Sequence, residues 1–298
     1  MSNRNTLASK RRRSTHISAA VFLTPALFFL AVFVLYPIIS SFQLSTTSWS
    51  GISPERDFIG LNNWRELITD SVFWLSFRNN IILMLLSLLF QVPFALALAT
   101  ILDVAGKRFI IFKVIWFLPL LMSTVAVGFL FRFALNANFG LVTFFSQQFG
   151  GGPIDLLGHA DRVIYAVVGV VAWRFIPFYM MLYLAGYSGL PEETYEAAII
   201  DGASRNQYFW HVALPLLSPV IRSGAVLSIV GSLAFFDLVF VMTGGGPSHA
   251  SELMATYMYR NAFWSQRMGY GATIASAMFI LISSISLLTI RFLNQRED

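Results

Sequence analysis

Apolar residues follow one another in long continuous runs along most of this chain, instead of alternating with polar ones. Such runs predict helices, because a strand with one buried face alternates apolar and polar residues. A helix needs about 20 mostly apolar residues to cross the hydrocarbon core of a bilayer. Six runs reach that length, at about 17–41, 74–102, 109–135, 163–186, 219–243 and 269–293. The pattern therefore predicts an all-α membrane protein with six transmembrane helices.

The residues outside these runs form two tails and several connections. We expect a basic tail at 1–16, a second tail at 294–298, and a long polar segment at 187–218. The basic residues before the first run are also a feature of signal peptides. However, that run is too long for a signal peptide and no small-residue cleavage site follows it. We therefore expect the chain from 17 to 293 to form one transmembrane domain that keeps its first span.

The composition excludes an ordinary soluble enzyme. Hydrophobic residues make up 56% of the chain and charged residues 12%, and the mean hydropathy is +0.68. Soluble domains contain about 25% charged residues. If the amino terminus is inside, the inner segments hold most of the 20 lysines and arginines. Because basic residues are enriched in cytoplasmic loops, both termini are predicted to be cytoplasmic.

Several chemistries find no support in the sequence. The chain has no cysteine, which removes disulfides and thiolate ligands, and its 4 histidines lack the spacing of a metal site. We therefore predict no metal site. A membrane enzyme would need an acid, base or nucleophile cluster near the interface, and neither such a cluster nor a G-x-S-x-G motif is present. Gly244–Pro247 (GGGP) is predicted to be an outer turn, since no P-loop lysine follows it.

The polar segment at 187–218 is typical of two short helices joined by a bend. Pro191, followed by two glutamates, suits a helix start. Gly202 permits a sharp bend between the two helices. We expect Pro215 and Pro219 to turn the chain back toward the fifth run.

Within this segment, Glu196-Ala-Ala is followed by Gly202 and then by Val212, Leu214 and Pro215. The pattern resembles the EAA loop of the permease subunits of bacterial ABC importers, with valine where isoleucine is commoner. Three further stretches resemble the MalF-type branch, which imports sugars and related polyols. They are FIGLNN at 58–63, the Trp-x-x-x-Pro-Phe pattern at 173–178, and FDLVFVMTGGGP at 236–247.

The resemblance implies a type I ABC importer permease fold in the bacterial inner membrane and a chain that is not itself an enzyme. It implies a sugar or polyol as solute, and two ATPase subunits that hold ATP and Mg²⁺. A second, MalG-like permease chain and an extracytoplasmic binding protein would complete the importer. This chain has no G-x-x-x-x-G-K-[ST] motif, so it cannot hold phosphates as a P-loop does. The implied ATPase-coupling residues are Glu196, Ala197, Ala198, Asp201, Gly202, Ala203, Leu214 and Pro215.

Two ionisable residues, Arg174 and Asp237, lie inside predicted spans. An ionisable residue in a span is costly and marks a functional site by default. The two residues could form a structural ion pair, or they could face the solute. By resemblance to the maltose member of the family, the fourth and fifth spans would hold the solute. Because a guanidinium pairs well with phosphate or carboxylate, Arg174 would also be compatible with an anionic solute. The implied path residues are Trp173, Arg174, Phe175, Phe178, Ser228, Ser232, Phe235 and Asp237.

One alternative function stays open from the residues alone. Asp237 and Arg174 could serve a secondary transporter driven by an ion gradient. Six spans would then require a dimer, and the EAA segment would have no role.

Overall fold

The computed structural model describes residues 21–294. The predicted tail at 1–16, the start of the first run at 17–20, and residues 295–298 of the second tail lie outside the described residues. The chain divides into two compact units. Of the described residues, the first unit holds 21–68 together with 261–276, and the second holds 69–260 together with 277–294.

The first unit begins with a helix over Val21–Leu44, which includes a π-helical turn η1 (Ala31–Leu35) and α2 (Tyr36–Leu44). Two short antiparallel strands follow, with Thr47 opposite Phe58 and Ser48 opposite Asp57. They are β1 (Thr47–Ser48) and β2 (Asp57–Phe58), and α3 (Asn62–Thr69) comes next. The buried Asn63 joins α3 to this hairpin, because its Nδ2 donates to the carbonyls of Ser45 and Thr47, each at 3.0 Å.

The second unit contains most of the helices. On the amino-terminal side they are α4 (Ser71–Ala105), the 3₁₀ turn η2 (Gly106–Phe109), α5 (Ile110–Leu121), α6 (Thr124–Ala134), α7 (Leu141–Gln148) and α8 (Ala160–Ser188). Then come α9 (Glu192–Ile200), α10 (Arg205–Tyr208), the π-helical turn η3 (Phe209–Ala213), α11 (Leu214–Leu233), α12 (Asp237–Met242) and α13 (Met254–Tyr259). The π-helical turn η4 (Arg260–Trp264) belongs mostly to the first unit, and α14 (Met268–Asn294) starts in the first unit and continues in the second.

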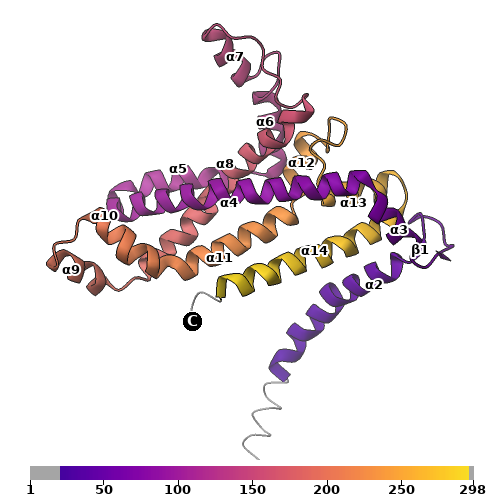
Figure 1. The fold of residues 1–298 in the computed structure, drawn as a ribbon, viewed down its shortest axis with the longest axis horizontal. Helices are drawn as coiled ribbons and strands as arrows, with labels where there is room; N and C mark the ends of the chain where they lie inside the picture. Colours follow the sequence, from indigo (N-terminus) through magenta and orange to yellow (C-terminus); the bar gives the residue numbers. More distant parts are fainter. Residues whose placement is uncertain (1–20, 295–298) are drawn as a thin grey trace, which may run out of the picture. The chain divides into compact units, whose positions relative to one another are not determined.

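The prediction of an all-α membrane protein is confirmed. Five described helices are long and apolar enough to cross a membrane: Val21–Leu44, Ser71–Val104, Ala160–Ser188, Arg205–Leu233 and Met268–Leu293. The pair α5 and α6 gives a sixth span if the two are counted together. Within the second unit, α4 and α8 pack along each other, and α5 and α11 lie against this pair (Figure 1).

The third predicted span, 109–135, is not one continuous helix. The axes of α5 and α6 are bent by 93° at Met122 and Ser123. Both residues have extended backbones, with ψ of 144° and 137°. The last carbonyls of α5 therefore lose their helical donors, and the carbonyl of Met122, directly after α5, accepts a hydrogen bond from Arg174 on α8. The predicted span at 109–135 is therefore a bent pair of helices, and its crossing of the membrane as one span stays a prediction.

The fifth predicted span, 219–243, also differs from the structure. Its helix is already continuous from Arg205 and ends at Leu233, and α12 is a separate short helix. The buried Asn80 on α4 explains this end, because its Nδ2 donates to the carbonyls of Ser232 and Leu233 at 2.9 and 3.1 Å. A side chain thus takes carbonyls that the next helical turn would otherwise have used.

Candidate functional site

The segment with the EAA pattern forms α9 and a turn outside the long helices. Pro191 precedes α9, and two glutamates in its first turn favour the helix through its dipole. Gly202 has a φ of +79°, and its N–H donates to the carbonyl of Ile199 at 2.9 Å. Ser204 then starts α10 with a capping box, in which Gln207 is the reciprocal partner. The predicted bend at Gly202 is therefore present.

The second of the two predicted short helices is not short. From Arg205 the chain runs without interruption into α11, so Pro215 and Pro219 lie within the helix and do not turn the chain back. The π-helical turn η3 comes immediately before this stretch. A π-helical turn changes the hydrogen-bond register, which lets a helix accommodate a following proline. Leu214 and Pro215 consequently stand on a different element from the coupling residues at 196–203.

The residues of α9 are mostly exposed. None of its residues is buried, and the apolar side chains of Ile199 and Ile200 are 53% and 84% exposed. Glu196 is exposed as well. A helix that presents both carboxylates and isoleucines to its surroundings is suited to packing against another protein.

The predicted path residues on α8 and α11 lie mostly in the interior of the second unit. Phe175 meets Phe235 edge to face, with ring centroids 6.0 Å apart. Ser228 donates to Oε1 of Gln91 on α4 at 3.1 Å, a partner that sequence reasoning missed. Of the remaining members, Ser232 is buried, Trp173 is partly buried, and Phe178 is 40% exposed.

Arg174 and Asp237 do not form the ion pair that was one of the two hypotheses. Among the described residues, neither has a salt bridge within 4.0 Å. Arg174 is 8% exposed, and its Nη2 donates to the carbonyl of Met122 at 3.0 Å, at the break between α5 and α6. Its Nη1 is buried without a hydrogen-bond partner. Asp237 is exposed in the first turn of α12, because the fifth span ends before it.

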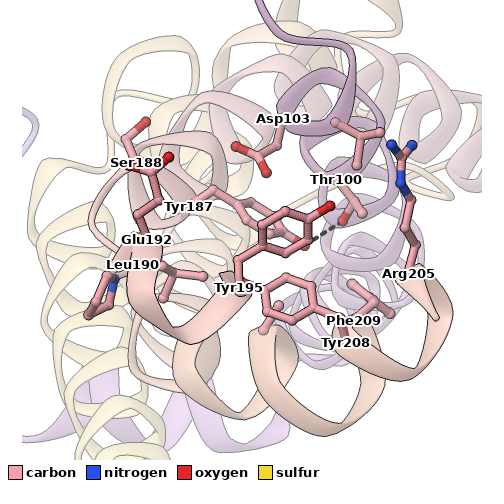
Figure 2. Close-up of a pocket in the computed structure, with 13 residues that line it drawn as sticks. Thr100, Asp103, Tyr187, Ser188, Leu190, Glu192, Tyr195, Arg205, Tyr208 and Phe209 are labelled. Atoms are coloured by element: carbon pink, nitrogen blue, oxygen red, sulfur yellow. Dashed lines mark hydrogen bonds between the residues drawn. The ribbon is translucent and has the colours of Figure 1, made fainter. Parts of the chain in front are cut away.

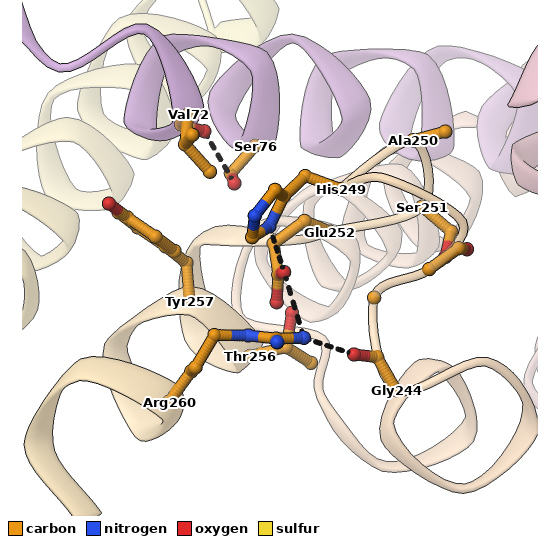
Figure 3. Close-up of polar contacts among 12 residues, drawn as sticks. Val72, Ser76, Gly244, His249, Ala250, Ser251, Glu252, Thr256, Tyr257 and Arg260 are labelled. Carbon is orange, nitrogen blue, oxygen red and sulfur yellow. Dashed lines mark hydrogen bonds and ion pairs between the residues drawn. The ribbon is translucent and has the colours of Figure 1, made fainter. Parts of the chain in front are cut away.

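A buried carboxylate on the predicted outer side was missed by sequence reasoning. Glu252 is 0% exposed, and its Oε2 lies 2.7 Å from Nδ1 of His249 and 3.2 Å from Nη2 of Arg260. Figure 3 shows the two basic side chains on either side of the Glu252 carboxylate. Arg260 also donates to the carbonyl of Gly244 at 2.5 Å. A buried carboxylate requires such partners, since an unpaired charge is costly in a protein interior.

The glycine run at 244–246 wraps around this carboxylate. Gly244 and Gly245 have φ values of +59° and +89°, which L side chains rarely adopt. A Cβ at Gly245 would come within 2.5 Å of Oε2 of Glu252. The predicted turn is present, and its glycines allow the backbone to approach a buried charge; its place on the outer side stays a prediction. Three consecutive glycines, with a glutamate at position 252 shortly after them, are the sequence signal that could have indicated this.

Comparison with known proteins gives one family model that covers most of the chain. Residues 74–297 match the model of the binding-protein-dependent transport system inner membrane component. The probable ABC transporter permease protein YurN of Bacillus subtilis is 35% identical over 282 residues, which cover 93% of this chain and 96% of that protein. The multiple sugar-binding transport system permease protein MsmF of Streptococcus mutans is 31% identical, with 93% and 95% covered.

The fold is also similar to that of a solved transporter. A crystal structure of a bacterial ABC transporter involved in the import of the acidic polysaccharide alginate has a TM-score of 0.81 at 22% identity, covering 97% of this chain and 99% of that chain. A second structure of a bacterial alginate ABC transporter, in complex with an alginate pentasaccharide-bound periplasmic protein, has a TM-score of 0.79 at 23% identity, covering 96% and 95%. At these identities the likeness concerns the fold.

Proposed function

This chain belongs to the family of binding-protein-dependent transport system inner membrane components, and on that premise we propose that it is the permease subunit of an ATP-driven importer of a sugar or related polyol. The chain is a multi-pass membrane protein of the importer permease type. The relatives named for multiple sugars and for alginate support a carbohydrate solute. The ion-coupled alternative has no comparable support, because it leaves the exposed α9 without a partner.

The residues at 196–203, with Leu214 and Pro215, are proposed to receive the motion of an ATPase subunit. The exposed carboxylates and isoleucines of α9 support this, because a helix with no buried residue needs a partner to hold it in place. ATP and Mg²⁺ would then be bound by two ATPase subunits. A second permease chain and an extracytoplasmic binding protein would complete the importer. A periplasmic protein bound to the alginate transporter supports the last of these partners.

The set of side chains on α8, α11 and α12 is proposed to line the solute path. Aromatic faces and hydroxyl or charged groups together suit a sugar, which has apolar C–H faces and many hydroxyls. The unpartnered Nη1 of Arg174 and the exposed carboxylate of Asp237 supply a donor and an acceptor. The proposed members are Trp173, Arg174, Phe175, Phe178, Ser228, Ser232, Phe235 and Asp237.

Asp237→Asn tests this path. The side chain is exposed and forms no hydrogen bond or close ion pair with the described residues, so the substitution is expected to leave thermal stability nearly unchanged. Loss of a charged hydrogen-bond acceptor for a solute hydroxyl is expected to raise KM for uptake about tenfold. Initial uptake rates in vesicles measure KM, with Asp161→Asn on the first turn of α8 as the matched control. An unchanged KM would remove Asp237 from the path.

Reconstitution in liposomes tests the function as a whole. The chain alone is expected to show neither ATP hydrolysis nor solute accumulation. When it is combined with an ATPase subunit, a second permease and a sugar-loaded binding protein, ATP hydrolysis is expected to rise with the correct solute. Concentration of sugar by the chain alone under an ion gradient would contradict the proposal.

A further inference from the structure

A pocket of about 440 Å³ lies where α9 and α10 meet the ends of α4 and α8 that are predicted to be cytoplasmic. This volume falls in the range of small-molecule sites, about 300–1,000 Å³. Figure 2 shows tyrosine rings facing the pocket, with the carboxylate of Asp103 on one side and Arg205 toward the other. The lining residues used below are Thr100, Asp103, Val104, Tyr187, Glu192, Tyr195, Arg205 and Tyr208. None of them belongs to the coupling or path residues assigned above.

The aromatic walls of the pocket are held in place by contacts within the protein. Tyr187 is 7% exposed, and its hydroxyl is 2.7 Å from Oγ1 of Thr100 in a hydrogen bond. Tyr195 and Tyr208 pack edge to face, with ring centroids 5.0 Å apart. Rings fixed in this way present π-faces to the cavity, and such faces attract an ammonium group.

The charged groups of the pocket form no close ion pair within the described part of the chain, although Asp103 interacts electrostatically with Lys113 over a longer distance. No salt bridge or side-chain hydrogen bond is formed there by Asp103, Glu192 or Arg205. Two carboxylates and one guanidinium thus face a cavity without neutralising one another at contact distance. This combination fits a ligand that carries a positive and a negative group together, since carboxylates bind ammonium and arginine binds phosphate.

The position of the pocket along the helices indicates where such a ligand comes from. Thr100 and Tyr187 lie in the last turns of two membrane-spanning helices, whereas Tyr195 belongs to α9 beyond them. The pocket is therefore at the depth of the lipid headgroups, where tyrosine is enriched. Val104, which also lines the pocket, is 57% exposed and offers an apolar surface beside it.

We propose that this pocket binds the headgroup of an inner-leaflet phospholipid that carries both a protonated amine and a phosphate. The ammonium lies against the tyrosine faces and Asp103, and the phosphate pairs with Arg205. The lipid thereby fills the space behind α9 and supports the helix from its membrane side. A basic side chain of a partner protein would match the carboxylates but would leave Arg205 facing a like charge.

Native mass spectrometry of the purified full chain with added lipids tests the proposal. Phosphatidylethanolamine is expected to bind more tightly than phosphatidylglycerol, which has no amine. Asp103→Asn, which keeps the side-chain shape, is expected to weaken phosphatidylethanolamine binding about tenfold and to abolish the preference. Arg205→Gln is expected to weaken the binding of both lipids. Glu193→Gln on α9 and Arg291→Gln on α14, which do not line the pocket, are expected to bind as the unmodified chain does.

Three results would overturn the proposal. The first is equal binding of the two lipids. The second is displacement of bound lipid by free phosphoethanolamine at the same concentration, which would indicate a soluble ligand. The third is unchanged lipid binding by Asp103→Asn together with weaker binding of an ATPase subunit, which would assign the pocket to a basic side chain of that partner. Tyr195→Leu gives a second variant that does not alter the pocket charge, and it is expected to weaken phosphatidylethanolamine binding.

Discussion

Gly202→Pro is expected to abolish uptake while the protein remains in the membrane in its usual amount. Proline holds φ near −65°, whereas Gly202 has a φ of +79°. Proline also removes the N–H that bonds to the carbonyl of Ile199. The turn after α9 must then rebuild, and the coupling surface moves with it. Radiolabelled solute uptake, with the membrane content of the chain followed by immunoblot, measures both effects.

Gly202→Asn is the matched control for this variant. Asparagine tolerates the left-handed conformation, and a Cβ at this position meets no heavy atom within 4 Å. This variant is therefore expected to keep most of the uptake. Equal loss in both variants would show that the bulk of any side chain, and not the turn, causes the effect. Normal uptake by Gly202→Pro would contradict the coupling role of the segment.

Charge reversal at Glu196 gives an independent approach to the same surface. The side chain is exposed on α9, so Glu196→Lys is expected to fold normally and to abolish ATP-driven uptake. Glu196→Gln keeps the shape of the side chain without its charge. Its uptake rate is expected to lie between those of the unmodified chain and Glu196→Lys. Binding of the ATPase subunit to the two variants, measured by co-purification, should follow the same order. Full uptake by Glu196→Lys would remove this residue from the coupling surface.

Glu252→Ala is expected to be the most destabilising single substitution in the loop between α12 and α13. Glu252 is fully buried, and its removal takes away the carboxylate that Arg260 and His249 contact and opens a cavity against Gly245. Breaking a fully buried pair by removing one partner costs about 3–5 kcal/mol, and the 31% exposure of Arg260 places the expected loss at the lower end of that range. Thermal unfolding of the purified chain in detergent measures the loss, with Glu193→Ala on the exposed α9 as control.

His249→Ala is expected to lower the thermal stability less than Glu252→Ala does. The His249 side chain is 36% exposed, and Glu252 keeps Arg260 when the histidine is lost. If Glu252→Ala and Glu193→Ala have the same thermal unfolding midpoint, the contacts of Glu252 with His249 and Arg260 contribute nothing to stability.

Asn80, a single polar residue within an apolar run, shows why the helix ends were hard to predict. Asn80 is fully buried and bonds to two carbonyls at the end of α11, and its Oδ1 accepts from the N–H of Met254. Sequence reasoning considered ionisable residues, serines and aromatic residues of the fourth and fifth spans and passed over this amide in the second. A single neutral polar residue changes the hydropathy of a run very little. Its partners lie more than 150 positions away in the chain, and only the fold brings them near.

The sequence by itself determined the membrane class of this protein, the approximate place of its spans, and the bend at Gly202. Lipid demands long apolar helices, and a positive φ favours glycine, so each of these features is local and visible in the chain. Only the tertiary structure decided that the third span breaks at Met122, that Arg174 bonds to this break and not to Asp237, and that Glu252 is buried. Each of these depends on which distant backbone carbonyl or charged side chain lies within a few ångströms, and hydropathy carries no information about that.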